Sequence, residues 1–302
     1  LTAGDLRHFR CLFIDTRILY AEYVDDNGHK WHFADSTNVY VGASIKQIGE
    51  MIGRPKMELP DYLIKYLGEG REFALLSEYK RRIISDYCLR DAQILYEAMN
   101  SLQEELLALG GQLCDTISGC SMDVFRRRFM QSPWSAVPPE VNAMARQAYY
   151  GARTEPYALG RIDGVNGYDV SSLYPAVMSD GKFPHPGALT VEFSPQNYGR
   201  LIERQGIAQV MIDIPEIDPP PLPVRVARHL FFPTGTVHGA WTTGEIRYAL
   251  SRGATLLKCD WIIWSGITFN PFAEFVDKLY KLKMLSASDS PVKYQVYKLL
   301  LN

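Results

Sequence analysis

The sequence predicts a mixed α/β fold of the α+β type, and three observations lead to that prediction. Apolar and polar residues alternate with the period of a strand over residues 1–40. Apolar residues recur at helical spacing over residues 94–106. A β-favouring run at residues 164–170 leads through a turn to Pro175, where a helix can start without losing a hydrogen bond. The chain of 302 residues is long enough to form two domains.

The composition is that of a globular protein. Apolar residues make up 47% and charged residues 22% of the chain, as in ordinary folded domains. No apolar run reaches the length of a membrane span, and the N-terminus lacks the layout of a signal peptide, so we expect no membrane partner. The five cysteines show no paired spacing typical of a metal site, and their odd number indicates a reducing compartment.

The net charge of −2 neither favours nor excludes a nucleic-acid partner, because phosphate contacts depend on local charge. Residues 121–161 hold six arginines against three acidic residues, and residues 271–302 hold five lysines against three acidic residues. Arg126, Arg127 and Arg128 stand together in the first segment. A solvated helix face and a face turned toward DNA both fit that triplet.

The first 70 residues predict three strands, a helix and a loop. Asp25–Gly28 has the residues of a hairpin turn between the second and third strands. Gly53 suits the end of the helix. The predicted ranges are strands at 11–14, 18–24 and 31–33, a helix at 43–52 and a loop at 54–70.

A long helix is predicted from Ser85 to Gly110, because its apolar residues recur at helical spacing. Tyr87 and Asp91 are four residues apart and therefore lie on one face of this helix. A tyrosine and an aspartate at that spacing can hold a metal ion and orient a water molecule for hydrolysis. Taken alone, the pair also fits an ordinary surface contact.

The rest of the chain combines helices and strands with two proline-rich interruptions. Pro133–Pro139 predicts a domain boundary, and Pro215–Pro223 predicts an exposed connection, because proline interrupts regular structure. The other predicted elements are a helix within 114–130, a strand at 207–214, a hairpin at 234–241, a helix at 243–251, a strand at 255–264 and helices at 272–284 and 292–302.

The most informative stretch is Tyr-Asp-Val-Ser-Ser-Leu-Tyr-Pro at residues 168–175. A central strand over Tyr168–Val170 would carry Asp169 to the edge of a sheet. The backbone N–H groups that follow would converge at a helix N-terminus, where anions bind well. A carboxylate for a metal ion beside amides for a phosphate suits the handling of a nucleoside triphosphate.

This stretch resembles motif A of the family B DNA polymerases, Asp-x-x-Ser-Leu-Tyr-Pro, with every fixed position filled. The resemblance implies that Asp169 binds both catalytic Mg²⁺ ions, with Val170 also at the metal site. It implies that the ring of Tyr174 lies under the sugar of the incoming nucleotide and excludes a 2′-hydroxyl group. The other nucleotide contacts that it implies are Ser171, Ser172 and Leu173.

The end of the chain, Lys-Leu-Leu-Leu-Asn at residues 298–302, resembles the first half of motif B of the same family. The resemblance implies that Lys298 binds the triphosphate and that Asn302 lies on the same helix face. Lys283 and Lys278 stand where the family has further basic residues near nucleotide and DNA. Without its neighbours, the pattern also fits an amphipathic helix with a solvent-facing lysine.

A third stretch, Tyr-Tyr-Gly-Ala-Arg at residues 149–153, resembles the Tyr-x-Gly-Gly/Ala motif between the two domains of family B enzymes. The resemblance implies that Tyr149, Gly151, Ala152 and Arg153 contact DNA. Glycine lets a backbone approach phosphate closely, and a neighbouring tyrosine can stack on a base.

Placed before motif A, Tyr87 and Asp91 resemble the third exonuclease motif of proofreading polymerases, Tyr-x-x-x-Asp. The resemblance implies a catalytic role for both residues and a metal-binding role for Asp91. The other acidic motifs are not recognisable, since Asp15–Arg17 lacks a glutamate and Asp35–Asn38 has its acid and amide in the wrong order. We therefore expect those motifs before this chain and the remaining polymerase carboxylates after it, so that the fragment alone is inactive.

The resemblance divides the chain into four expected regions. The long spacing between motifs A and B is typical of the protein-primed branch, in which an insertion there grips a terminal protein. The regions are the C-terminal part of an RNase H-like 3′–5′ exonuclease domain at 1–112, a connecting segment at 113–160, a polymerase palm at 161–270 and the start of helical fingers at 271–302.

The implied function is template-directed addition of deoxynucleotides to a primer 3′-hydroxyl group. The implied partners are primer-template DNA, deoxynucleoside triphosphates and, for the protein-primed branch, a terminal priming protein. The expected location is a bacterial or virus-infected cytoplasm, with an organelle left open. Two alternatives stay open: a non-catalytic nucleic-acid-binding fragment or decayed homologue, and a repair nuclease that relies on its exonuclease.

Overall fold

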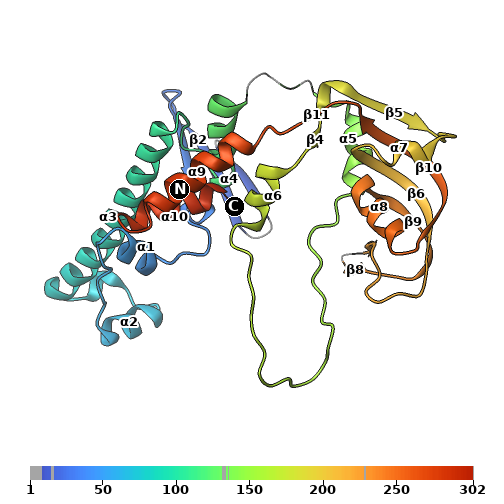
Figure 1. Cartoon of the computed structure of the whole chain (residues 1–302). Helices are drawn as coiled ribbons and strands as arrows, with labels where there is room; N and C mark the ends of the chain where they lie inside the picture. Colours follow the sequence, from blue (N-terminus) through green and yellow to red (C-terminus); the bar gives the residue numbers. More distant parts are fainter. Residues whose placement is uncertain (1–8, 15–16, 131–133, 135, 228, 302) are drawn as a thin grey trace. The chain divides into compact units, whose positions relative to one another are not determined.

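The structure, a computed structural model, describes residues 9–14, 17–130, 134, 136–227 and 229–301. Helices and strands both contribute, which confirms the predicted α+β class (Figure 1). The chain forms two compact units, and each unit is assembled from separate stretches of sequence. Unit 1 comprises Leu1–Gln131, Ser172–Ser179 and Phe272–Asn302, and unit 2 comprises Ser132–Ser171 and Asp180–Pro271.

The first strands of unit 1 form an antiparallel sheet and confirm the strand predictions for this part of the chain. The last turn of the sheet forms because the Asp25 carboxylate accepts hydrogen bonds from the backbone N–H groups of Asn27 and His29, at 3.0 and 2.9 Å. Gly28 completes the turn with a φ of +80°. The strands, in the order of the sheet, are β1 (Phe9–Ile14), β2 (Arg17–Val24) and β3 (Lys30–Ala34).

The next predicted helix is confirmed as α1 (Ile45–Met51). Ser44 fixes its start, because the Ser44 and Gln47 side chains each bond to the other residue's backbone N–H. Gly53 follows the helix with a φ of +72°.

The predicted loop at residues 54–70 is wrong in part, because α2 (Asp61–Gly68) forms within it. Pro60 stands directly before this helix, where the missing N–H group of proline costs no helical hydrogen bond. Leu63 is completely buried in a small apolar cluster with side chains from outside the helix. Tertiary burial therefore stabilises a helix where the prolines alone indicate a loop.

The predicted long helix is confirmed as α3 (Glu78–Ala108), which begins earlier than expected. Its buried residues recur at helical spacing and include Ile94, Leu102 and Leu106. Gly110 ends it with a φ of +80°. The other helical elements of this part are η2 (Ser36–Asn38), η3 (Phe73–Leu75), α4 (Ile117–Val124) and the π-helix η4 (Phe125–Phe129).

Three helices from later parts of the chain complete unit 1. The helix α10 packs against α9, α3 and α4 (Figure 1). One apolar core joins them, with Leu102 of α3, Leu279 of α9 and Leu300 of α10 all nearly inaccessible to solvent. The three helices are α6 (Leu173–Asp180), α9 (Ala273–Leu285) and α10 (Pro291–Leu301).

Unit 2 is built on an antiparallel sheet of four strands with a helix on each face. Val210 and Ile212 are buried with Ile246 of α8 (Thr243–Ser251), whereas Trp261 packs with side chains of α5 (Pro139–Gln147). The strands, in the order of the sheet, are β5 (Leu189–Phe193), β10 (Thr255–Ser265), β6 (Gly206–Ile214) and β9 (Gly235–Thr242).

The predicted hairpin at residues 234–241 is wrong, because this stretch enters the single strand β9, which pairs with β6 along its length. Gly239 is not a turn residue. A Cβ atom there would lie 2.7 Å from the ring of Trp241, so the glycine leaves room for a buried tryptophan.

Several short elements complete unit 2. Residues 215–223 contain neither helix nor strand, as predicted, but the predicted exposure is wrong in part, because Leu222 is completely buried in the core of unit 2. The short elements are β4 (Phe183–Pro184) paired with β11 (Thr268–Phe269), β7 (Val224–Val226) paired with β8 (His229–Phe231), η5 (Pro186–Ala188) and α7 (Tyr198–Leu201).

The predicted central strand at Tyr168–Val170 is wrong, because none of residues 151–170 lies in a helix or a strand. The sheets that the described residues form do not include this segment. A strand needs a paired neighbour to satisfy its backbone hydrogen bonds, so β-favouring residues alone do not make one. The helix expected after it is confirmed as α6, which begins at Leu173.

Candidate functional site

The motif A segment presents its side chains to solvent. Asp169 and Val170 are exposed, and Tyr174 at the start of α6 is 70% exposed. Between them, Ser172 adopts a φ of +56°, a left-handed conformation that is uncommon for residues other than glycine. The carboxylate and the aromatic ring of this segment are therefore both accessible to a ligand.

A buried ammonium group of α9 contacts the turn before α6. Lys283 is only 7% exposed, and its Nζ donates a hydrogen bond of 3.0 Å to the Oγ of Ser172. The ring of Tyr280 lies 4.6 Å from the same Nζ, which adds a cation–π contact. No carboxylate in the described part of the chain pairs with Lys283. Because a buried charge without a counter-ion is costly, this ammonium group is suited to an anionic ligand.

The other predicted nucleotide and DNA residues of unit 1 lie outside this contact. Lys298 is exposed on α10, and Lys278 is exposed on α9. Neither lysine forms a hydrogen bond or an ion pair with any described residue. Asn302 lies outside the described residues. Both lysines are therefore accessible to phosphate groups.

On α3, a lysine from an earlier segment joins Tyr87 and Asp91. The Nζ of Lys56 lies 2.6 Å from the Oδ2 of Asp91 and 4.6 Å from the centre of the Tyr87 ring. Burial lowers the pKa of Lys56, but hydrogen bonds to Asp91 and Tyr87 outweigh burial and raise the pKa overall. The Oδ1 of Asp91 is buried and has no partner among the described residues. One carboxylate oxygen of Asp91 therefore makes no hydrogen bond within the described part of the chain.

A cavity of about 700 Å³ lies beside this group. Its walls include two lysines, two carboxylates, two apolar side chains of α2 and an aromatic ring: Lys46, Lys56, Glu58, Asp61, Ile64, Leu67 and Tyr87. This lysine-bearing cavity therefore combines apolar walls with charged groups of both signs, so its lining alone does not select the charge of a ligand.

The predicted DNA motif of unit 2 lies directly after α5. Gly151 has a φ of +83°, which favours glycine at this position. The Nη2 of Arg225 donates hydrogen bonds to the carbonyl oxygens of Tyr149 and Tyr150, at 2.9 and 3.1 Å. Tyr150 stacks on Trp241, whereas Tyr149 is 75% exposed and Ala152 is also exposed. The backbone is thus fixed while one aromatic ring stays accessible.

Arg153 supports the fold at this point. Its guanidinium group lies 3.7 Å from the centre of the Phe232 ring, and its Nη1 donates a 2.8 Å hydrogen bond to the carbonyl of Pro220. It also pairs with the carboxylate of Glu155. These contacts already occupy much of the cationic group, so its contact with DNA stays a prediction.

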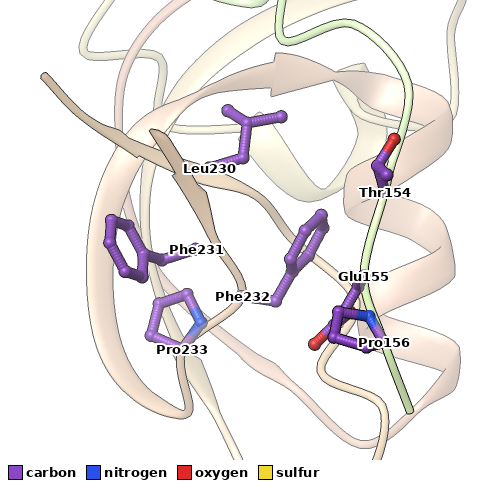
Figure 2. Close-up of a pocket in the computed structure, with 7 residues that line it drawn as sticks. All are labelled: Thr154, Glu155, Pro156, Leu230, Phe231, Phe232 and Pro233. Carbon is purple, nitrogen blue, oxygen red and sulfur yellow. The ribbon is translucent and has the colours of Figure 1, made fainter. Parts of the chain in front are cut away.

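A cavity of about 480 Å³ lies beside Arg153 (Figure 2). Figure 2 shows the Phe232 side chain between the two segments that form the walls, whereas Phe231 points away from the opposite segment. The walls are Thr154, Glu155 and Pro156 on one side and Leu230, Phe231, Phe232 and Pro233 on the other.

The carboxylates in the described part of the chain do not complete a metal site. No three histidine, cysteine, aspartate or glutamate side chains among these residues lie close enough together to hold an ion. Asp169 is a single exposed carboxylate, and Asp91 is already paired with Lys56. Two ions held about 4 Å apart need carboxylates from more than one element, so these residues alone do not fit a pair of Mg²⁺ ions.

Sequence reasoning did not identify Lys56, although it contacts both residues of the predicted exonuclease motif. The lysine stands 35 residues before Asp91, in a segment predicted as a loop. A single basic residue after a proline has no periodic pattern to mark it.

Among the described residues, no helix is both long and apolar enough to cross a membrane.

Comparison with known proteins extends these observations. The family model described as "DNA polymerase type B, organellar and viral" matches residues 72–302. A protein named "Probable DNA polymerase" from Neurospora intermedia is 26% identical over 263 residues, which cover 82% of this chain and 27% of that protein. A protein of the same name from Ascobolus immersus is 25% identical over 197 residues, which cover 62% of this chain and 16% of that protein. The chain thus spans less than a third of the length of these relatives.

Solved structures share the fold at lower identity. An orthorhombic crystal form of phi29 DNA polymerase has a TM-score of 0.66 at 17% identity and covers 97% of this chain and 50% of that chain. The same polymerase complexed with primer-template DNA and incoming nucleotides has a TM-score of 0.68 at 17% identity, over 95% of this chain and 51% of that one. The matched family model includes Asp91, Asp169 and Lys298 and covers well over half of the residues, and this chain therefore belongs to the type B DNA polymerases of organelles and viruses.

Proposed function

We propose that this chain is the central part of a DNA polymerase that adds deoxynucleotides to the 3′-hydroxyl group of a primer. Family membership supports this chemistry. The observation that carries the proposal to particular residues is the hydrogen bond from the buried Lys283 to Ser172. It sets a desolvated ammonium group at the turn that follows Asp169 in the sequence.

In this proposal, Lys283 and Lys298 bind the triphosphate of the incoming nucleotide. Because Lys283 is buried, its ammonium group has already lost most of its hydration. Binding a phosphate oxygen therefore costs this group little further dehydration and adds a charge-assisted hydrogen bond. Lys298 is exposed and supplies a second positive charge. The backbone around Ser171, Ser172 and Leu173 offers N–H groups at the start of α6, where phosphate binds well.

The Tyr174 ring has the proposed role of selecting the sugar. An aromatic ring packed under a deoxyribose leaves no space for a 2′-hydroxyl group, so the selection is steric. Its 70% exposure agrees with a surface that a nucleotide would cover. Packing within this chain therefore leaves the ring accessible for the proposed role.

The metal chemistry of the proposal needs more of the polymerase than this chain shows. Asp169 would supply one carboxylate ligand, with Val170 beside it. A second carboxylate-bearing element, outside the described residues, would complete the site for two Mg²⁺ ions. Bound Mg²⁺ would stabilise the charge that develops during phosphoryl transfer.

Primer-template DNA is the proposed partner of Tyr149, Gly151, Ala152 and Arg153, and Lys278 is proposed to contact the same DNA. The fixed backbone and the exposed Tyr149 ring support contacts to phosphate and to an unpaired base. Similarity to phi29 DNA polymerase supports the fold of the protein-primed branch, and a terminal priming protein is a further proposed partner. The family description leaves a virus-infected cytoplasm and an organelle as proposed locations.

A second candidate function is 3′–5′ proofreading by the region that contains α3. The buried Oδ1 of Asp91 has no partner among the described residues, which favours a role in binding a cation. Tyr87 lies beside it and borders the lysine-bearing cavity. We propose that residues 1–112 are the C-terminal part of an exonuclease domain, residues 113–160 the connection, 161–270 the palm and 271–302 the start of the fingers.

Primer extension with Mg²⁺ and all four deoxynucleotides tests the proposal. In the complete enzyme, Asp169→Asn should lower extension by about 10³-fold or more, because a metal ligand contributes several kcal/mol to the transition state. Asp163→Asn is the matched control, since this aspartate is exposed in the same segment. Equal extension by the two variants would contradict the proposal.

The same assay on the 302-residue chain separates the polymerase from its non-catalytic alternative. The chain should bind DNA weakly, with an affinity that falls as salt rises, and should neither extend nor degrade a primer. An inactive complete enzyme that still binds DNA would favour a decayed homologue.

A further inference from the structure

The helix α3 supports two different features along its 31 residues. Its first half carries Tyr87 and Asp91, the proposed exonuclease residues. Through Ala98, Leu102 and Leu106, its second half belongs to the apolar core that also includes residues of α9 and α10, and it packs against α10. The helix α10 carries Lys298, the lysine proposed to bind the triphosphate. The helix of this lysine therefore packs on the second half of α3.

Most of the contact between α3 and α10 is apolar. Leu102 and Leu106 of α3 belong to the same buried cluster as Val296 and Leu300 of α10. Apolar burial is non-directional, so it holds the helices together more firmly than it fixes their rotation or sliding. The direction in which Lys298 points therefore depends on polar contacts as well.

One such contact is centred on Glu105 of α3. The side chain of Glu105 is only 12% exposed, and the Nζ of Lys293 lies 2.7 Å from one of its oxygens. The hydroxyl group of Tyr297 donates a hydrogen bond to the other oxygen. Tyr297 is itself buried, and this burial, with the hydrogen bond to Glu105, raises the pKa of its hydroxyl group. The donor therefore keeps its proton at neutral pH.

A second polar contact holds the other side of Lys298. The Oγ of Ser121, on α4, donates a 2.6 Å hydrogen bond to the backbone carbonyl of Leu300. Tyr297 directly precedes Lys298, and Leu300 follows two residues later. Both contacts have fixed directions, so together they set the rotation of α10 with Lys298 facing solvent.

We propose that Glu105 is a positioning residue for α10, which aims Lys298 at the triphosphate through its contacts with Tyr297 and Lys293. This inference rests on the proposed function, in which Lys298 binds the nucleotide. Glu105 itself touches no substrate. Losing it should therefore weaken nucleotide binding and leave the chemical step intact.

Steady-state primer extension by the complete enzyme tests the role of Glu105. Glu105→Ala should raise the KM for deoxynucleotides about tenfold and change kcat less than about twofold, because a buried hydroxyl donor loses its acceptor and α10 rotates. Glu105→Gln keeps an acceptor for Tyr297, so its KM should rise less. Glu104→Ala is the matched control, since Glu104 is the exposed neighbour on α3.

The double variant Glu105→Ala/Lys298→Ala shows whether Glu105 acts through Lys298. Its KM should equal that of Lys298→Ala alone, because residues that act as a unit are not additive. If Glu105→Ala is too unstable to assay, Tyr297→Phe removes the same hydrogen bond and should also raise the KM.

The outcomes separate the inference from the proposed function. A merely structural role would reduce the active fraction, and so kcat, with an unchanged KM, which would overturn the inference. An unchanged KM in Glu105→Ala or Tyr297→Phe beside a raised KM in Lys298→Ala would also overturn it. An unchanged KM in Lys298→Ala would instead overturn the proposed role of Lys298.

Discussion

Asp91 and Asp169 are aspartates with related proposed chemistry, yet their surroundings differ sharply. Asp91 lies on the long helix α3, paired with Lys56 at 2.6 Å and partly shielded from solvent. Asp169 is exposed on a stretch of twenty residues, 151–170, that contains neither helix nor strand. One carboxylate is held in a defined position, and the other has no described partner.

The difference teaches how far each kind of element depends on the rest of the protein. A helix makes its hydrogen bonds between residues four positions apart, so α3 needs only its own sequence and an apolar surface to pack on. A central strand needs neighbours on both sides. The motif A segment has β-favouring residues but no described neighbour, so its geometry would have to come from another part of the polymerase.

The largest expected effect would separate the two aspartates by reaction. In the complete polymerase, Asp91→Asn should lower 3′–5′ degradation of single-stranded DNA by about 10³-fold or more, because a metal ligand is lost. Primer extension should change less than about twofold, since the polymerase chemistry is assigned to Asp169. Asp86→Asn, an exposed change on the same helix, is the control. Parallel loss of both activities would mean that the two regions do not serve separate reactions.

A smaller effect is expected at the turn that follows Asp169. Lys283→Met keeps the length of the side chain but removes its charge, and it should raise the KM for deoxynucleotides by about 10-fold to 100-fold. The free energy of unfolding should not fall, because the variant no longer buries an ammonium group without a described counter-ion.

Lys281→Met is the matched control for Lys283→Met. Lys281 lies on the same helix and is 68% exposed in a pair with Asp277, so its loss should change neither quantity much. Lower stability of Lys283→Met with an unchanged KM would assign Lys283 to packing alone.

The smallest expected effect is on the pH dependence of stability, and it comes from a hydrogen bond between Tyr40 and α3. The Tyr40 hydroxyl group donates a 2.8 Å hydrogen bond to the backbone carbonyl of Ala98, and burial raises the pKa of Tyr40 from 10.0 to about 12. Because the pKa of Tyr40 is higher in the folded state than in the unfolded state, the protonated Tyr40 hydroxyl group contributes fully to the free energy of unfolding below pH 10. This contribution is lost as pH rises toward 12. The loss should reach about 1 kcal/mol by pH 11.

Denaturant unfolding between pH 9 and pH 11 measures this loss against two variants. Tyr40→Phe should lose less stability over that range than the unchanged chain. Tyr96→Phe, at an exposed tyrosine of α3, should behave like the unchanged chain. The same pH dependence in all three proteins would show that Tyr40 titrates no differently when the chain is folded.

Helix predictions with clear local signals matched the structure. The helix Thr243–Ser251 has its predicted ends, because Thr242 and Glu245 form a capping box at its start. The α2 helix was missed, because the prolines near it indicate a loop while the burial of Leu63 depends on residues far along the chain. Gly239 looked like a turn residue, although it makes room for Trp241 within a strand.

The candidate site was predictable only in part, and for the same reason. The spacing of Tyr87 and Asp91 fixes their shared helix face, which a sequence shows directly. The contact between Lys283 and Ser172 joins residues 111 positions apart, and no local pattern reports such a distance. The pairing of Asp91 with Lys56 is hidden in the same way.

Hydrogen exchange of backbone amides tests most directly whether the motif A segment depends on the rest of the polymerase. In the 302-residue chain, amides 164–170 should exchange at nearly unprotected rates, while those of residues 94–106 in α3 exchange slowly. In the complete enzyme, α3 should be unchanged and residues 164–170 should become protected as a paired strand. Protection of residues 164–170 in the chain alone, or none in either protein, would contradict the account.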